Sequence, residues 1–490
     1  MTTQNTTHII LRRATRVFAF LICCLGLLGT LNQITSYKYG DGMLQPQLIE
    51  ELPDNSCDVM FFGSSRVFEN VNTGQLWDEW GIASFNSCGS VQPLWDTYYY
   101  MLQAFEKQHP RVAVVEVYRA VETRDYADES RIIKNTFSLP ANLSLEAKEV
   151  SAPEDQLADY ILEWPFYHGR VDELTREDFL PYKGSERWKN WKGFSANFTH
   201  GNFEEPDVSQ VTERKPLSDK SQEYLVKIID LCEERDIPLV LIVAPYPLSE
   251  SEQAVYNSVS DYAARRGVPF INFNLDYESA GIDFSTDFAS DSHLNYLGAN
   301  NFTQVLGQYL KDNYDLPDRR GETGYDSWQR DADDIRARRR DHQLSIFTNP
   351  SELIGQTLSS DNADDYLILV AKNNANLSWT GWDNTFTTLS KYGLTEPSSS
   401  VGAFALQGHK KLYESLANEY EWYTSAGSKR VMISRDEAGV TKLRFADASI
   451  DVPSGGMVVL VYNVHTDQIV TCATWLTSPS GFAIQEYIEQ

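Results

Sequence analysis

The chain is poor in cysteine, histidine and positive charge. Its 490 residues include 6 Cys and 8 His, and 42 Lys plus Arg stand against 69 Asp plus Glu. No Cys pair has C-x-x-C spacing, and no His, Asp or Glu cluster has the spacing of a metal site, so we expect neither a metal nor another cofactor. A formal net charge of −27 repels a phosphate backbone. The composition therefore argues against a nucleic-acid partner.

Long hydrophobic runs are also scarce. The mean hydropathy of −0.39 excludes a polytopic membrane protein, and only residues 17–31 form a long apolar run. Arg12, Arg13 and Arg16 precede it, which orients the N-terminus toward the cytoplasm. The run is shorter than the ~20 residues of a typical span, so a cleaved signal peptide is the alternative. Because no A-x-A-type cleavage site follows, we predict an uncleaved signal anchor that crosses the plasma membrane once.

The four cysteines beyond the anchor are expected to be free thiols. Cys57 precedes one predicted strand, and Cys88 follows the next, parallel strand. These positions lie at opposite ends of a sheet, about 15 Å apart at ~3.3 Å per residue. A disulfide requires Cα atoms within about 7 Å. We therefore predict no Cys57–Cys88 bridge.

Residues 55 to 315 alternate between apolar strands and amphipathic helices. Continuous apolar strands separated by helices predict a parallel sheet covered on both faces, which is an α/β fold. The predicted strands are 59–62, 83–86, 112–117, 239–243 and 269–273, and the predicted helices are 72–80, 94–107, 218–235, 250–266 and 295–311.

Chemically suggestive residues follow several of these strands, at the edge where parallel sheets hold their ligands. Gly63-Ser64-Ser65-Arg66 follows the first strand, Cys88-Gly89 the second and Tyr118-Arg119 the third, and Asp291-Ser292-His293 precedes the last helix. A serine that opens a helix can attack a carbonyl if a histidine takes its proton and a carboxylate orients the imidazole. The combination is typical of a serine hydrolase or acyltransferase.

This combination resembles the SGNH (GDSL-like) hydrolase superfamily, and most of all its membrane-anchored branch of DltD-like and alginate-acetylation-type proteins. The resemblance implies a three-layer, flavodoxin-like domain. By position, Ser65 matches the nucleophile and His293 the catalytic histidine. The backbone N–H groups of Ser65 and Gly89 match the oxyanion hole.

Two departures from the family pattern stand out. The third block, Gly-x-Asn-Asp, is absent, and Tyr118 and Arg119 occupy the end of that strand as alternative oxyanion or substrate contacts. The usual Asp lies three residues before the His, where this chain has Ser290. Asp291 is therefore our candidate for orienting the imidazole, with Asp287 as the fallback.

Each of these residues also has a purely structural interpretation. Ser65 and Asp291 are residue types that cap helices, and His293 could be no more than part of a helix N-terminus. A catalytically degenerate SGNH scaffold is the alternative to an enzyme.

Residues 120 to 216 form an aromatic insertion between the third and fourth strands. Its aromatic side chains could stack on sugar rings as a cap over the site, or could form a small satellite core. They include Trp164, Phe166, Tyr167, Phe179, Tyr182, Trp188, Trp191 and Phe194.

The C-terminal part begins with a segment dense in both signs of charge, expected to be a solvated linker or helix. Beyond it, strands at 365–372, 456–462 and 468–473 and a helix at 382–392 predict a smaller α/β domain. These stretches resemble the interleukin-like EMT inducer domain, which implies a noncatalytic, glycan-binding module. The predicted organisation is 1–16 cytoplasmic, 17–34 anchor, 45–315 SGNH-like domain with insertion 120–216, 316–355 linker and 356–490 C-terminal module.

Together these resemblances imply an extracytoplasmic O-acyltransferase or esterase acting on acetyl groups of a cell-surface polysaccharide. A membrane-bound O-acyltransferase is the implied protein partner. The alternative is a scaffold with a glycan-binding module that serves polysaccharide assembly or export. The net charge of −27 makes a strongly anionic polymer an unfavourable substrate unless Arg66 and Arg119 form a local basic patch.

Overall fold

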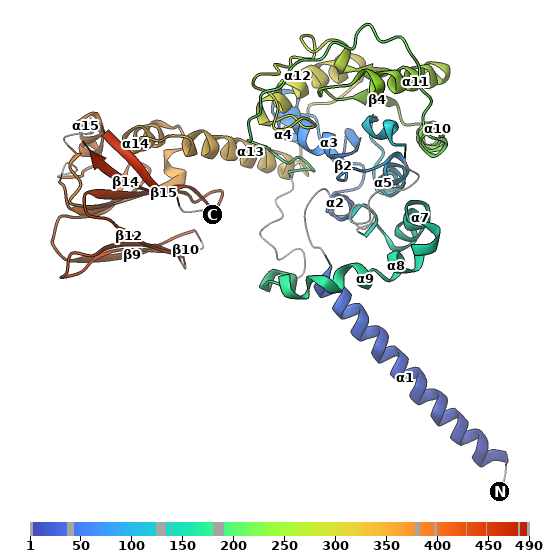
Figure 1. Ribbon diagram of the computed structural model, residues 1–490, viewed down its shortest axis with the longest axis horizontal. Helices are drawn as coiled ribbons and strands as arrows, with labels where there is room; N and C mark the ends of the chain where they lie inside the picture. Colours follow the sequence, from blue (N-terminus) through green and yellow to red (C-terminus); the bar gives the residue numbers. More distant parts are fainter. Residues whose placement is uncertain are drawn as a thin grey trace. The chain divides into compact units, whose positions relative to one another are not determined.

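The computed structural model describes residues 3–36, 44–123, 134–137, 139–179, 191–377, 383–395, 399–427, 429–446, 448–478 and 481–487. The chain divides into two compact units, Met1–Ala332 and Asp333–Gln490. Figure 1 shows a sheet flanked by helices in the first unit and β-rich layers in the second. The predicted α/β class is therefore confirmed.

The first unit is built on a five-stranded parallel sheet with the order β2-β1-β3-β4-β5. Every residue of the first four strands is buried, as expected for a sheet covered on both faces. The strands are β1 Val59–Gly63, β2 Ser84–Cys88, β3 Val112–Glu116, β4 Leu239–Val243 and β5 Phe270–Asn272.

The flanking helices begin and end at residues with clear local causes. Ser249 and Glu252 form a reciprocal capping box at the start of α11, and Gly267 ends that helix at φ 68°. Helix α5 packs beside α10, and α12 packs beside α3 and α4. The main helices are α3 Ser65–Asn70, α4 Thr73–Trp80, α5 Leu94–Lys107, α10 Asp219–Glu234, α11 Glu250–Arg266 and α12 Tyr296–Asn313.

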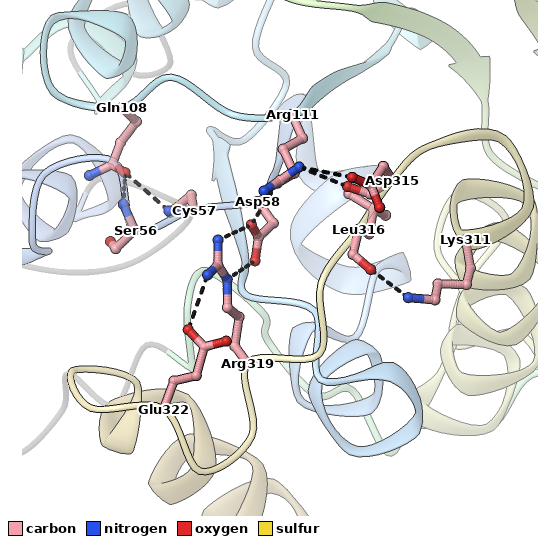
Figure 2. Close-up of polar contacts among 10 residues, drawn as sticks. All are labelled: Ser56, Cys57, Asp58, Gln108, Arg111, Lys311, Asp315, Leu316, Arg319 and Glu322. Atoms are coloured by element: carbon pink, nitrogen blue, oxygen red, sulfur yellow. Dashed lines mark hydrogen bonds and ion pairs between the residues drawn. The ribbon is translucent and has the colours of Figure 1, made fainter.

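The amino end of β1 is closed by an ion-pair cluster around the buried carboxylate of Asp58 (Figure 2). Asp58 is 3% exposed, and its carboxylate accepts two hydrogen bonds from Arg319, at 2.9 and 3.1 Å. Arg111 lies 3.5 Å from the same carboxylate. Pairing with Asp58 raises the pKa of Arg319. This cluster ties the segment after α12 to the start of the first strand.

The N-terminal helix α1, Thr3–Thr35, contains a 24-residue stretch, Arg12–Thr35, that is long and apolar enough to cross a membrane. Length and composition alone support this assignment.

The insertion forms short helices. These are η1 Tyr118–Val121, α7 Ala141–Ser151, η2 Glu154–Gln156, α8 Leu157–Leu162, α9 Trp164–Tyr167, η3 His168–Glu173 and η4 Arg176–Phe179. Tyr160 and Tyr167 are buried against Phe166 in a separate small cluster, and Phe194 is also buried. These contacts favour the satellite-core interpretation over a sugar-stacking cap. Tyr182 and Trp188 lie outside the described residues.

The charged segment is helical. Helix α13 covers Asp326–Ser345 and is followed by α14 Pro350–Ser359, which Asn349 caps. Trp328 and Ile335 are buried on α13, so the helix carries apolar positions among its charges.

The second unit stacks two antiparallel sheets. One has the order β15-β14-β13-β6-β7-β8 and the other β12-β11-β10-β9. Alternate residues of β6 face two different cores, Ile368 toward α14 and α15 and Leu369 toward the four-stranded sheet. The elements are η7 Ala363–Asp365, β6 Tyr366–Asn373, α15 Asp383–Lys391, β7 Gly402–Gln407, β8 Lys410–Ser415, β9 Tyr420–Ala426, β10 Lys429–Arg435, β11 Thr441–Phe445, β12 Ala448–Val452, β13 Gly456–Asn463, β14 Gln468–Ser478 and β15 Gly481–Tyr487.

The cysteine prediction is confirmed. All six thiols are free, and the four beyond α1 are buried. Cys57 precedes β1, whereas Cys88 is the last residue of β2.

Candidate active site

The candidate nucleophile opens the short helix α3. Gly63 ends β1 at φ 144°, and a Cβ there would lie 2.8 Å from the carbonyl oxygen of Glu116, so this turn requires glycine. Ser64 is the N-cap residue and makes no side-chain capping bond. The Ser65 hydroxyl lies 2.7 Å from His293 Nε2. Its partner is therefore the histidine, and the helix-cap alternative for Ser65 is not the arrangement that the structure shows.

His293 sits on a tight loop before α12. The His293 carbonyl accepts a hydrogen bond from Ala289 N at 3.0 Å, and Asn295 caps α12 by accepting from Leu297 N and Gly298 N. Asn70, at the end of α3, accepts a hydrogen bond from Leu294 N at 3.1 Å. The loop is thus fixed directly against the helix that carries Ser65.

The other imidazole nitrogen faces hydroxyl groups. Ser292 Oγ lies 3.1 Å and Ser290 Oγ 3.3 Å from His293 Nδ1. With Nε2 accepting the Ser65 proton, Nδ1 carries the hydrogen and donates it to these oxygens. Among the described contacts of Nδ1 there is no carboxylate.

The two carboxylates considered from the sequence lie elsewhere. Asp291 is exposed, and it acts on His293 through its charge, which works to raise the pKa of the imidazole. Asp287 is buried and accepts hydrogen bonds from Asp283 N, Thr286 Oγ1 and Asn301 Nδ2. These three hydrogen bonds fix the loop before α12, and none of them is to the imidazole of His293.

Sequence reasoning missed a carboxylate, that of Glu69, which lies near the same imidazole nitrogen of His293 as Ser65 does. Glu69 Oε1 is 3.8 Å from His293 Nε2, and Glu69 Oε2 accepts a hydrogen bond from Asn197 Nδ2 at 3.0 Å. Glu69 stands four residues after Ser65 on α3, and residues with this spacing share one face of a helix. That spacing is the signal that could have found it.

The site favours a neutral imidazole. Burial, and then the nearby positive charge of Arg66, lower the pKa of His293 from 6.5 to about 4. A histidine that is unprotonated at neutral pH can accept a proton from a serine hydroxyl.

Arg66 is an interior cation next to Ser65, the candidate nucleophile. It is 1% exposed, and its guanidinium carbon lies 3.8 Å from the ring centre of Tyr118 and 3.5 Å from that of Tyr246. Burial raises the pKa of the neighbouring Glu116 to about 7. Contacts with two aromatic rings offset part of the cost of burying the cation.

Among the described residues around the site, Arg66 and Arg119 do not form a basic surface patch. Arg66 is buried, and Arg119 forms an ion pair with Glu122 in which both side chains are largely buried. Tyr118 lies against Arg66 and Tyr246. The structure accounts for Tyr118 and Arg119 through these contacts, and it gives no bond from either residue to Ser65 or His293.

The surroundings of Gly89 are crowded with amides. Its N–H donates a 3.4 Å hydrogen bond to the Gly63 carbonyl, so it belongs to the sheet ladder. A Cβ on Gly89 would lie 2.4 Å from Asn135 Oδ1 and 2.6 Å from Gln92 Oε1. Asn135 is buried at this place, and its Nδ2 donates a 3.3 Å hydrogen bond to the Ser90 carbonyl. Sequence reasoning missed this residue because it comes from the insertion.

Comparisons with known proteins add little to this geometry. No family model matches the chain, and no curated protein matches it. Among solved structures, a proposed acylhydrolase from Bacteroides fragilis aligns with 54% of this chain and 93% of its own, at 12% identity and a TM-score of 0.29. This similarity is too low to support an inference about fold or activity.

Proposed function

We propose that the first unit is a serine-dependent acyl-transferring enzyme of the SGNH type, acting on O-acyl groups of a cell-surface polysaccharide. The observation that carries the proposal is the 2.7 Å contact between Ser65 Oγ and His293 Nε2. It joins residues 228 positions apart in the sequence, and the lowered imidazole pKa of about 4 keeps His293 unprotonated at neutral pH.

In the first half-reaction Ser65 Oγ attacks the acyl carbonyl carbon while its proton passes to His293 Nε2. The tetrahedral intermediate then expels the sugar or donor oxygen, which takes the proton back from His293. This leaves the acyl group on Ser65. In the second half-reaction water or a sugar hydroxyl gives its proton to His293 and attacks the acyl carbon. The bond from the acyl carbon to Ser65 Oγ then breaks, and Ser65 Oγ takes the proton back from His293. Water makes the protein an esterase, and a sugar hydroxyl makes it a transferase.

Two negative charges flank the imidazolium that forms in each step. Glu69 Oε1 is 3.8 Å from the nitrogen that receives the proton, and Asp291 acts from the solvent side of the loop. Ser290 and Ser292 orient the ring through Nδ1. The arrangement replaces the single buried carboxylate of a Ser-His-Asp triad with two hydroxyls and two nearby charges.

For the oxyanion we propose the backbone N–H of Ser65 as the first donor. Gly89 is the second donor in the SGNH pattern, and its long 3.4 Å bond to Gly63 must break for it to serve. Asn135 presents its carbonyl oxygen to Gly89 while its Nδ2 donates to the Ser90 carbonyl, so we do not assign it as an oxyanion donor.

The setting of the reaction is proposed from the sequence resemblance and the apolar helix α1. A signal anchor would hold both units outside the cytoplasm at the plasma membrane. A membrane-bound O-acyltransferase that delivers acyl groups would be the partner, and the second unit would contact glycan.

Turnover of a small acetyl ester by the full-length protein in detergent tests the chemistry. We expect Ser65→Ala and His293→Ala each to lower kcat/KM by at least ~10³-fold, because nucleophile and base act as a unit. Ser209→Ala, which changes an exposed serine, is the matched control and should retain full activity. Equal turnover in all four proteins would remove Ser65 and His293 from the mechanism.

The degenerate-scaffold alternative is favoured by one observation, the absence of a carboxylate at Nδ1 among the described contacts. It predicts an inert wild type that still binds polysaccharide through the second unit. Retained binding to immobilised polysaccharide, together with no ester turnover and no acyl transfer to it, would support the scaffold over the enzyme.

A further inference from the structure

Exposed apolar side chains of the first unit are concentrated in one part of the insertion. In the described part of this unit outside α1, the exposed large apolar residues are Leu145, Ile161, Leu162, Val171 and Phe179, at 42–64% exposure, together with Leu275 and Leu297 elsewhere. Five of the seven thus fall within residues 145–179. Single exposed apolar residues need no explanation, whereas a concentration of them in one segment indicates an interaction site.

The same segment holds the C-terminal end of α1. Helix α1 contacts α9, η3 and η4, and Thr35 and Ser36 are buried. Arg170 Nη1 donates hydrogen bonds to the carbonyl oxygens of Thr35 at 2.5 Å and Ser36 at 2.8 Å. The last turn of α1 has no basic residue of its own. Arg170 therefore supplies the cation that complements the helix C-terminus.

Arg170 is itself held in place from within the segment. Asp178 accepts its hydrogen bond at 3.1 Å and also accepts from the backbone N–H of Thr175. These bonds lower the pKa of Asp178, so the carboxylate stays charged. The Arg170–Asp178 hydrogen bond joins η3, which carries Val171, to η4, which carries Phe179. These two exposed residues are consequently fixed close to the end of α1.

Further contacts join this segment to the body of the unit. Glu163 forms a buried ion pair with Lys148 of α7 and accepts a 3.2 Å hydrogen bond from Asn32 of α1. Ser151 at the end of α7 donates a 2.7 Å hydrogen bond to the buried Asp96 of α5. A continuous set of buried polar contacts thus links α1, the insertion and α5.

We propose that residues 157–179, here called the collar, lie in the interfacial zone of the bilayer from which α1 emerges. The inference rests on the proposed signal anchor. If α1 spans the hydrocarbon core, Thr35 stands at its outer boundary, because the apolar stretch ends there. The exposed apolar residues of the collar then meet lipid headgroups and the upper acyl chains, as interfacial helices do.

The net negative charge of the collar determines which type of membrane surface it can bind. The collar, residues 157–179, contains six acidic residues and two arginines. An anionic membrane would repel this segment, so binding depends on apolar insertion into a zwitterionic or neutral surface. With α1 and the collar both engaged, the first unit is held in one orientation over the membrane.

The test uses the full-length chain in phosphatidylcholine vesicles, with Cys23 and Cys24 replaced by alanine. Single variants Leu162→Cys and Phe179→Cys carry a bimane dye, and Leu275→Cys is the matched control because it is exposed outside the collar. Lipids with a nitroxide near the headgroup quench the dye where it touches the bilayer. We expect about threefold stronger quenching at residues 162 and 179 than at 275. Replacing part of the lipid with phosphatidylglycerol should give no increase, because anionic lipid repels the acidic collar.

Three outcomes would overturn the proposal, and they differ in what else they affect. Quenching at 162 and 179 that equals the control, in protein that floats with the vesicles, removes the collar contact and leaves the anchor. Quenching that rises with phosphatidylglycerol contradicts apolar insertion as the binding mode. Protein that does not float removes the anchor and the collar together. Ester turnover by the same labelled samples reports separately on the proposed chemistry.

Discussion

The two ends of strand β1 differ in whether their buried charged side chains have hydrogen-bond partners. At the amino end the Asp58 carboxylate meets Arg319 in a two-bond pair and Arg111 at 3.5 Å (Figure 2). At the carboxyl end Arg66 is equally buried, yet its Nε and Nη1 have no hydrogen-bond partner among the described residues, and neither has Ser64 Oγ. The buried carboxylate at the amino end therefore has hydrogen-bond partners, whereas buried polar atoms at the carboxyl end have none among the described residues.

The paired charges at the amino end fit a structural role, and the unpaired polar atoms at the carboxyl end fit a role in chemistry. Buried polar groups are normally hydrogen-bonded, so an exception calls for a reason. Burial, and then the charge of the Arg66 cation held by aromatic rings, lower the pKa of His293, and perturbed titration of this kind is common at functional sites. The amino-end cluster, in contrast, has the completed pairing expected of a structural tie.

Breaking the amino-end pair should give the largest effect on stability. Arg319→Met leaves the Asp58 carboxylate buried with only Arg111 beside it, and we expect a loss of about 3 kcal/mol in the free energy of unfolding. Denaturant unfolding measures this. Arg214→Met, which removes the exposed pair with Asp261, is the control and should cost less than about 1 kcal/mol. Similar losses in both variants would contradict a structural role for the cluster.

Changing the carboxylates at the other end should affect turnover and leave stability nearly unchanged. We expect Glu69→Gln to lower kcat/KM about tenfold and Asp291→Asn about threefold, because charge near Nε2 is less screened than charge in solvent. Steady-state kinetics on both isosteric variants, with unfolding midpoints alongside, tests the order. A larger loss for Asp291→Asn would restore the orienting role that the sequence pattern assigned to Asp291.

Much of the fold could be predicted from the sequence because its signals are local. The continuous apolar strand 239–243 and the helices 94–107 and 250–266 have the predicted bounds. Apolar periodicity and capping residues lie within the segments that they define. The predicted strand at 269–273 is shorter in the structure, Phe270–Asn272, since its residues are only partly buried at the sheet edge.

The candidate site was only partly predictable because its remaining contacts are between distant segments. The motif pattern placed Ser65 and His293 together, as the structure does. Nothing local to Asp291 shows that Ser290 and Ser292 take the Nδ1 position. The burial of Arg66 between the end of β1 and the Tyr118 and Tyr246 rings depends on three separate strand ends. A solvent-exposed arginine and this interior one look alike in sequence.

The rate at which a fluorophosphonate modifies the folded full-length protein, measured against pH, tests the Ser65–His293 pair most directly. We predict one addition, mapped to Ser65 by peptide mass, with a rate that is constant near neutral pH and falls as the pH drops through about 4, because protonated His293 cannot accept the Ser65 proton. An unperturbed histidine would give a midpoint near 6.5. Absence of modification at Ser65, or an equal rate in His293→Ala, would contradict the account.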